Sequence, residues 1–314
     1  MNPADGQASD PVGGILYVVA TPIGNLGDVT IRALDVLRAV PLIAAEDTRL
    51  THRLLDRHGI DGRLTSYHAR SGRGRLTALL EHLRGGADLA LVTDAGTPVV
   101  SDPGADLVAA WAAEGGRVVP IPGASAVLAA VAASGLAGPR WTFEGFLPRS
   151  GRERRDRLAA IAVDPRGSVL FEAPGRVAAT LRDLAAACGP ARSGAVCREL
   201  TKIHEQIVRA PLGELAEAVA AGAIPARGEF VLVVGMDPDR ATPAGRDAAA
   251  AGGTSPSTGT RPASSDEAGE ALAAALREVE RLVEAGTARG EAARRVSKAT
   301  GIGRRRLYEV SDGG

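Results

Sequence analysis

Short apolar runs alternate with stretches of helical period in the first part of the chain, and this alternation constrains the fold most. The runs are ILYVVA (15–20), LIAA (42–45), LALVT (89–93) and RVVPIP (117–122). Segments such as IRALDVLRAV (31–40) separate them. Strands that alternate with helices form a parallel sheet with helical crossovers. Ligands bind outside the carboxyl ends of such strands, so we expect the chemistry in the loops that follow them.

A second α/β pattern begins near residue 123. Its candidate strands are WTFEGF (141–146), SVLFEA (168–173), GAVCREL (194–200), EQIVRA (205–210) and EFVLVVG (229–235). Several of these runs follow one another without a helical segment between them, which favours a mixed sheet. The sequence therefore predicts an α/β fold with an N-terminal parallel sheet, a C-terminal mixed sheet and helices on both.

Composition favours a soluble globular protein whose surface has no overall charge bias. Hydrophobic residues make up 45% of the 314, and Lys plus Arg equals Asp plus Glu at 37 each. Binding of nucleic acid must then come from local patches. No apolar run approaches the roughly 20 residues of a membrane span. Cys188 and Cys197 are too few for a disulfide framework, so we expect reduced cysteines and a cytoplasmic protein without membrane association.

A stretch rich in Pro, Gly, Ser, Thr and Ala separates the second α/β pattern from a basic tail. It has no hydrophobic period and cannot form a core. The tail predicts two or three short helices, with a turn at Gly301-Ile302-Gly303 in a helix-turn-helix pattern. The predicted organisation is a flexible N-terminus (1–13), an N-terminal α/β domain (14–122), a C-terminal α/β domain (123–236), a disordered linker (237–266) and a small helical basic domain (267–314).

Three turns of small residues follow the predicted strands of the first sheet. They are ATPIGNLGDVT (20–30), the segment Asp94-Ala95-Gly96-Thr97, and PIPGASA (120–126). None matches GxGxxG or GxxxxGK[ST], so the sequence does not support a dinucleotide or triphosphate loop. An ordinary capped turn explains the first of them equally well. Three such turns along one sheet edge nevertheless predict a ligand pocket with Asp94 as its strong acceptor.

Two acidic residues and an arginine meet after the second predicted strand. Glu46, Asp47 and Arg49 could orient a polar substrate or act as acid and base. Alternatively, Asp47 or Thr48 begins the next helix as its N-cap, while Arg49 pairs with Glu46. Both interpretations stay open at this stage.

Other reactive side chains show no catalytic or metal-binding spacing. The histidines are scattered, and no Ser-His-Asp pattern lies on a nucleophile elbow, so we expect no metal. Five arginines lie within PRSGRERRDR (148–157). Arginines at this density suit phosphate contacts, although a solvated helix face paired through Glu153 and Asp156 is the competing interpretation.

The motifs in their order resemble the ribosomal RNA small-subunit 2'-O-methyltransferase I family, within the tetrapyrrole methylase superfamily. They are TPIGNLGDVTIRAL, AAEDTR, LVTDAGTPVVSDPG, PIPGASA, EGFLPR, CRELTK and GEFVLVV. The resemblance runs over about residues 14–236, and the tail matches more loosely. It implies a tetrapyrrole-methylase-like fold, a homodimer, S-adenosyl-L-methionine as cofactor, and methylation of a decoding-centre cytidine ribose in 16S ribosomal RNA of the small subunit.

The resemblance also implies which residues contact the cofactor and the substrate. The cofactor residues that it implies are Pro22, Ile23, Gly24, Asp94, Ala95, Gly96, Thr97, Ala124, Ser125, Ala126, Glu172, Ala173, Arg209 and Ala210. Asp47 is the proposed base or orienting residue, with Glu46 and Arg49 shaping the site. The expected RNA-binding residues are Arg149, Arg152, Arg154, Arg155, Arg304, Arg305 and Arg306.

Two departures from the family's pattern limit what it implies. Where relatives commonly show Tyr-Glu-Ser and then His-Arg, this chain has Phe171-Glu172-Ala173 and later Arg176. No role for the missing Ser and His can be carried over.

Two alternatives to an RNA methyltransferase also follow from the same fold: a methylase of tetrapyrrole or corrinoid precursors, and a ribosome-binding assembly factor without turnover.

Overall fold

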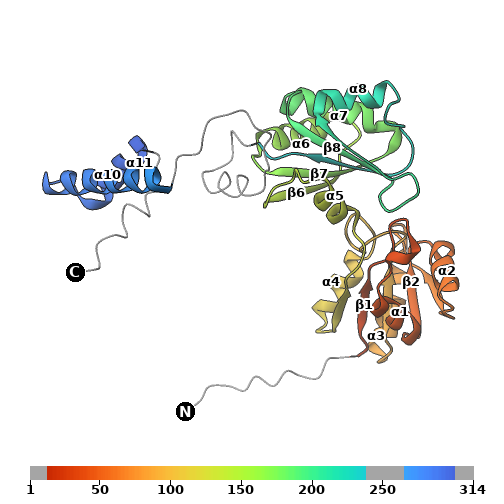
Figure 1. Ribbon diagram of the computed structural model, residues 1–314. Coiled ribbons are helices and arrows are strands. Elements are labelled where there is room, and N and C mark those ends of the chain that lie inside the picture. Colours follow the sequence, from red (N-terminus) through yellow and green to blue (C-terminus); the bar gives the residue numbers. More distant parts are fainter. Residues whose placement is uncertain (1–12, 238–264, 301–314) are drawn as a thin grey trace, which may run out of the picture. The chain divides into compact units, whose positions relative to one another are not determined.

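The computed structural model describes residues 13–237 and 265–300 of the chain. These fall into two compact units, one for each range (Figure 1). Residues 1–12 of the predicted N-terminus, residues 238–264 of the predicted linker, the predicted turn at 301–303 and the arginines Arg304, Arg305 and Arg306 lie outside the described residues. The domain boundaries given above stay predictions.

The first sheet is entirely parallel, as the alternating sequence pattern predicts. Its strands are β1 (Leu16–Val19), β2 (Leu42–Ala45), β3 (Leu64–Ser66), β4 (Leu89–Val92) and β5 (Val118–Ile121). They lie in the order β3-β2-β4-β1-β5. No sequence pattern predicts β3, because its three residues are only partly buried at the sheet edge and form no apolar run.

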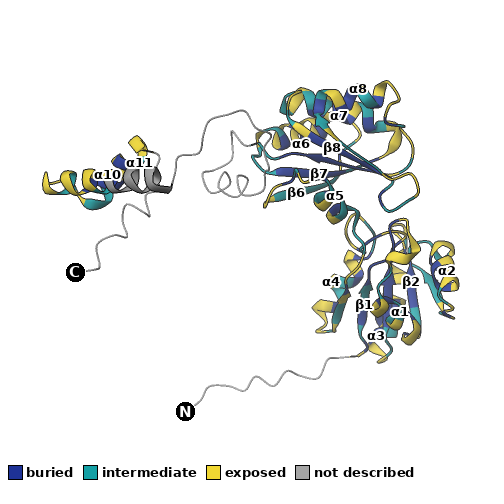
Figure 2. Ribbon diagram, in the orientation of Figure 1, coloured by how far each residue is buried: buried dark blue, intermediate teal, exposed yellow. Residues whose placement is uncertain are grey.

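Helices cover both faces of the parallel sheet. They are α1 (Ile31–Ala39), α2 (Thr48–Arg57), α3 (Arg73–Arg84) and α4 (Ala105–Ala113). Leu37 and Leu55 pack with Ile43 on one face, beneath α1 and α2. Leu83 and Trp111 pack on the other face, beneath α3 and α4. Figure 2 shows the buried strands between these partly exposed helices.

The second sheet is mixed, which confirms the second part of the fold prediction. Its strands are β6 (Trp141–Phe146), β7 (Gly167–Glu172), β8 (Ser193–Arg198), β9 (Gln206–Pro211) and β10 (Phe230–Val234). The order is β6-β7-β10-β8-β9, and only the β6–β7 pair is parallel. The helices of this part are α5 (Ala126–Ser134), α6 (Gly151–Val163), α7 (Val177–Cys188) and α8 (Leu212–Ala220).

Alternate residues of the second sheet face different helices. Leu170 and Leu232 pack against α6, α7 and α8, whereas Val169 and Val231 pack against α5. Figure 1 shows α5 on the opposite side of the sheet from the other three helices. This alternation is the period of two that strand geometry dictates.

Polar caps begin three helices that follow strands of the parallel sheet. The hydroxyl of Thr30 accepts from Ala33 N, and the hydroxyl of Ser125 accepts from Leu128 N. The carboxylate of Asp47 accepts from Arg49 N at 2.9 Å. Each cap satisfies an N–H group that the first turn of the helix leaves free, and so fixes where the chain turns after the strand.

The second unit is a pair of helices, α10 (Ser265–Glu284) and α11 (Arg289–Thr300). Ala275 and Val279 pack against Ala292, Ala293 and Val296. None of the described helices is long and apolar enough to cross a membrane.

Candidate functional site

A cavity of about 380 Å³ lies in the first unit, lined by loops and strands of both sheets. Loops after β1, β4 and β5 supply Ile23, the segments 95–97 and 100–102, and Ser125. The second sheet contributes Phe146 and Phe171 among others. The cavity therefore lies where the carboxyl ends of parallel strands meet, the usual ligand position in such sheets.

The wall of this cavity is largely apolar, with a few hydroxyl and carboxyl side chains. Phe171 packs edge-on against Phe143, with ring centroids 5.0 Å apart. Asp102, Glu172 and Glu229 are the acidic members of the lining, and among the described residues no Lys, Arg or His joins them. Such a wall suits a flat, partly apolar ligand with positive charge, and it offers no cation to a phosphate group.

Eight of the fourteen predicted cofactor residues line the cavity. They are Ile23, Ala95, Gly96, Thr97, Ser125, Ala126, Glu172 and Ala173. Pro22, Gly24, Asp94, Ala124, Arg209 and Ala210 are absent from the lining. The guanidinium group of Arg209 instead donates to the backbone carbonyls of Ser134 and Ala133.

Asp94 joins two neighbouring strand ends instead of facing the cavity. Its Oδ1 accepts from Asp47 N at 2.8 Å. Burial raises the pKa of the Asp94 carboxyl group. This bond ties the loop after β2 to the loop after β4, and so holds Ala95 and Gly96 in place at the cavity.

Asp102 lines the cavity, although it is not among the cofactor residues expected from the sequence. Burial, followed by the nearby carboxylate of Glu46, raises the pKa of Asp102 to about 6. A carboxyl group in this state ionises most readily when a cation lies beside it. The only signal in the sequence was its position between Ser101 and Pro103, which also fits an ordinary turn.

Two loops at the cavity hold non-glycine residues in the left-handed region. Val99 and Ser101 have φ of 76° and 66°, and Glu199 and Thr201 have φ of 51° and 66°. Such conformations are uncommon for non-glycine residues and unfavourable for β-branched Val and Thr. Ser101 and Leu200 line the cavity, so this backbone strain lies at the site itself.

A lysine and two glutamates fix the second of these loops. Lys202 Nζ lies 3.1 Å from Glu199 Oε1 and 3.0 Å from Glu229 Oε2. The side chain of Lys202 passes directly over Gly24, where an added Cβ would lie 2.4 Å from Lys202 Cγ. Gly24 is thus required by close packing, although it does not line the cavity.

Asp47, Glu46 and Arg49 meet at the end of β2, but not in the predicted pairing. Arg49 pairs with Asp47, with Nη2 and Oδ2 2.6 Å apart, and not with Glu46. Glu46 Oε2 accepts from the hydroxyl of Thr93 at 2.7 Å. The bond with Arg49 lowers the pKa of Asp47 to about 2, so this carboxylate is a weak proton acceptor at neutral pH.

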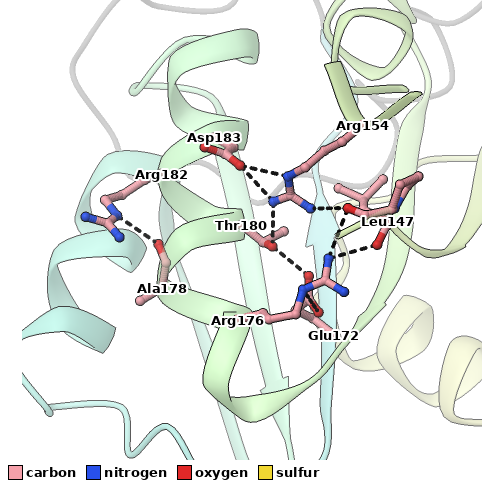
Figure 3. Close-up of polar contacts among 9 residues, drawn as sticks. Leu147, Arg154, Glu172, Arg176, Ala178, Thr180, Arg182 and Asp183 are labelled. Carbon is pink, nitrogen blue, oxygen red and sulfur yellow. Dashed lines mark hydrogen bonds and ion pairs between the residues drawn. The ribbon is translucent and has the colours of Figure 1, made fainter. Parts of the chain in front are cut away.

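The structure corrects the predicted role of Arg154, which is buried. Its Nη2 donates to Thr180 Oγ1 at 2.9 Å and pairs with Asp183 at 2.7 Å (Figure 3). Thr180 in turn donates to Glu172 Oε2 at 2.6 Å. Arg154 therefore supports the cavity wall through Glu172 and is not free to contact RNA.

The other arginines of the 148–157 cluster are exposed. Arg152 lies 3.4 Å from Asp156, as the competing interpretation predicts, whereas Arg149 and Arg155 have no carboxylate partner among the described residues. Within residues 13–237 and 265–300, His, Cys, Asp and Glu side chains form no group that could hold a metal ion.

A sequence model of the tetrapyrrole (corrin/porphyrin) methylases matches residues 15–216. The chain belongs to the tetrapyrrole methylase family. Within it, the chain is 44% identical to "Ribosomal RNA small subunit methyltransferase I" of Synechocystis sp., over 95% of this chain and 97% of that protein. The protein of the same name from Escherichia coli O157:H7 is 46% identical over 73% of this chain and 80% of its own length.

Solved structures of other tetrapyrrole methylases share the fold. Cobalt precorrin-4 methyltransferase has a TM-score of 0.55 at 18% identity, over 70% of this chain and 94% of its own. Uroporphyrin-III C-methyltransferase from Thermus thermophilus, complexed with S-adenosyl homocysteine, has a TM-score of 0.51 at 21% identity, over 71% and 97% of the two chains. The chain therefore has the fold of these enzymes in both sheets.

Proposed function

We propose that this protein transfers a methyl group from S-adenosyl-L-methionine to the ribose 2'-oxygen of a decoding-centre cytidine in 16S ribosomal RNA. The observation that carries the proposal is the cavity: its lining, as far as the structure describes it, bears carboxyl groups and no basic side chain. The relatives that share 44–46% of this sequence act, by their name, on small-subunit ribosomal RNA.

The residues of the cavity fit this cofactor. S-adenosyl-L-methionine carries positive charge on its sulfonium and ammonium groups and has no phosphate. Asp102 can bind such a cation, and Phe146 and Phe171 offer apolar surface to the adenine ring. The small residues Ala95 and Gly96 allow a ligand to approach the backbone closely. When bound, the cofactor supplies an electrophilic methyl group on sulfur.

The protein's own contribution is alignment and exclusion of water. Direct displacement at carbon requires the ribose oxygen to lie behind the methyl group. Holding the two reactants in this geometry lowers the activation barrier, because the entropy of bringing them together is lost on binding. Asp47 is bound to Arg49 and has a low pKa, so we assign it to orienting the substrate with Glu46 and Arg49 rather than to accepting the proton.

The remaining parts of the proposal concern partners and location. Arg149 and Arg155 are exposed and remain candidates for RNA contact, and Arg304, Arg305 and Arg306 stay predictions. We also propose a cytoplasmic homodimer, which rests on the resemblance described above. The small-subunit ribosomal RNA is then its macromolecular partner.

A methylase of tetrapyrrole precursors is the second candidate. The fold alone supports it. The solved tetrapyrrole enzymes are 18–21% identical in sequence to this chain, whereas the ribosomal RNA methyltransferases are 44–46% identical to it. An assembly factor without turnover would keep the fold and lose the chemistry.

Labelled S-adenosyl-L-methionine and unmethylated small ribosomal subunits test the proposal. We expect one ribose methylation per particle, mapped by its resistance to alkaline cleavage. Label in a corrinoid or porphyrin precursor instead of RNA would support the second candidate. Binding to particles without any transfer of label would leave only the assembly factor.

A further inference from the structure

The charge distribution on α2, β3 and the start of α3 differs from that of the chain as a whole. Between residues 48 and 78 there are seven arginines and two aspartates, in a chain whose formal net charge is zero. Six of the basic residues in this stretch form what we call the basic band: Arg49, Arg53, His68, Arg70, Arg73 and Arg75. All six are exposed.

Secondary structure brings the basic band together. Arg49 and Arg53 are four residues apart on α2, and therefore lie on the same helix face. The other members follow β3, the edge strand that is paired only with β2. Arg75 Nη1 donates to Thr65 Oγ1 at 3.0 Å, which ties the first turn of α3 to that strand.

Two shallow hollows mark this surface. The first is lined by Thr48, Arg49, His52, Arg53, Asp56 and Leu64. Residues between the end of β3 and the first turns of α3 surround the second, with Ser66, His68, Ser71 and Arg75 as its polar members. Exposed arginines beside hydroxyl and imidazole groups are the donors that phosphate oxygens accept from in RNA and DNA complexes.

Most guanidinium groups of the basic band have no acidic partner. Arg49 pairs with Asp47, but Arg53, Arg70 and Arg73 have no carboxylate within 4.0 Å among the described residues. The cluster at 148–157 differs, because Arg154 and Arg157 pair with Asp183 and Glu144. Unpaired arginines remain available to an outside anion, and each paired one would first have to leave its carboxylate.

The basic band begins beside the cavity. Arg49 is in the first turn of α2, whose N-cap Asp47 donates its backbone N–H to Asp94. The next residue along the chain from Asp94 is Ala95, which lines the cavity. A polyanion lying on the basic band would therefore pass the rim of the cavity.

We propose that the basic band binds the phosphodiester backbone of the RNA strand that flanks the methylated nucleotide. This inference rests on the proposed function for the identity of the RNA. Arginines contact the phosphates through paired N–H groups, while the target ribose reaches the rim of the cavity, whose described lining residues include no basic side chain. The contacts set affinity and position, and they carry no sequence information.

The test compares two triple variants of the full chain. One replaces arginines of the basic band: Arg53→Gln, Arg70→Gln and Arg73→Gln. The control replaces Arg117→Gln, Arg140→Gln and Arg182→Gln. Its three arginines are also exposed and lack carboxylate partners among the described residues, and the first two directly precede β5 and β6, away from the strands' carboxyl ends. Both variants lose the same charge.

Binding to a protein-free transcript of small-subunit RNA is measured by filter retention. We expect the band variant to lose about a hundredfold in affinity near 100 mM salt, and the slope of log affinity against log salt to fall by about 2. Cofactor affinity, measured by calorimetry, stays that of the wild type in both variants, which also shows that they fold.

Equal RNA affinity of the two triple variants would overturn the inference. So would a band variant that binds the protein-free transcript normally but fails on small subunits, because an acidic protein would then be the partner. Failure of the proposed function looks different: wild-type protein transfers no methyl group to any RNA, whatever the variants bind.

Discussion

The cavity and the basic band lie at the same edge of the parallel sheet, and their charges are opposite. The cavity has Asp102, Glu172 and Glu229 in its wall and no cation among the described lining residues. The basic band has five arginines and a histidine, and within residues 13–237 and 265–300 only Arg49 of these pairs with a carboxylate. The contrast suggests a separation of tasks: a cationic small molecule enters the cavity, and a polyanion remains outside it.

Removal of Arg154 is expected to cause the largest change and to affect the cavity side alone. Arg154→Ala removes a buried donor from Thr180, from the carbonyl of Pro148 and from the partly exposed carboxylate of Asp183. We expect a loss of about 3 kcal/mol in the free energy of unfolding, measured by urea denaturation. The neighbouring exposed residue serves as control: Arg155→Ala should change stability by less than about 0.5 kcal/mol. Equal stability of the two variants would contradict the structural role.

Salt should distinguish the two regions in the unmodified protein. If the band makes about four phosphate contacts, a fourfold rise in salt weakens RNA binding about fiftyfold. The affinity for the cofactor should change by less than about twofold, because its partner Asp102 is inside the cavity. Filter retention and calorimetry at the same salt concentrations check this. A similar salt response of both ligands would mean that the separation of tasks is wrong.

Asp102→Asn should weaken cofactor binding without changing RNA binding. The loss of a charged hydrogen bond of about 2 kcal/mol corresponds to about thirtyfold in affinity. Asp94→Asn is the matched comparison, since the Asp94 carboxylate is bound to Asp47 N and is absent from the cavity lining. We expect a smaller effect from it in calorimetry. The reverse order of the two variants would assign the cofactor to Asp94 instead.

The pH dependence of cofactor binding should be smaller still. Burial raises the pKa of Asp102 from 3.8 to about 6. A cation binds the ionised form, so cofactor affinity falls about tenfold as pH drops from about 7 to 5. The free energy of unfolding changes with pH in the opposite direction. Without ligand, the folded protein holds the Asp102 proton more tightly than the unfolded chain does, so the contribution of Asp102 to stability falls as pH rises from about 4 to 6. Calorimetry across this range should show a pH dependence that Asp102→Asn loses; a flat wild-type profile would contradict the assignment.

Much of the fold could be predicted because its signals are local. Helix α1 and the strands β1, β2 and β4 coincide with their periodic segments almost residue for residue. Strand β3 could not be found in this way, since the three residues Leu64–Ser66 gain their strand conformation from pairing with β2.

The site was only partly predictable, because side-chain partners come from distant parts of the chain. Arg154 looked like a surface cation among its sequence neighbours, but its side chain is buried and pairs with Asp183, 29 residues further along the chain. Asp102 looked like a turn residue, and its elevated pKa depends on Glu46 and on burial that no local pattern encodes. Sequence spacing placed the loops at one edge correctly, but it did not show which side chains face inward.

The left-handed residues Val99, Ser101, Glu199 and Thr201 have a further consequence for how quickly the cavity can accept a ligand. Each holds its backbone about 1–3 kcal/mol above a relaxed conformation, and the surrounding fold must maintain all four before any ligand arrives. The two loops that hold these residues therefore take their final conformation during folding and not on ligand binding. Association with a small cation would therefore have a single kinetic phase, limited by diffusion into the cavity and not by rearrangement of its walls.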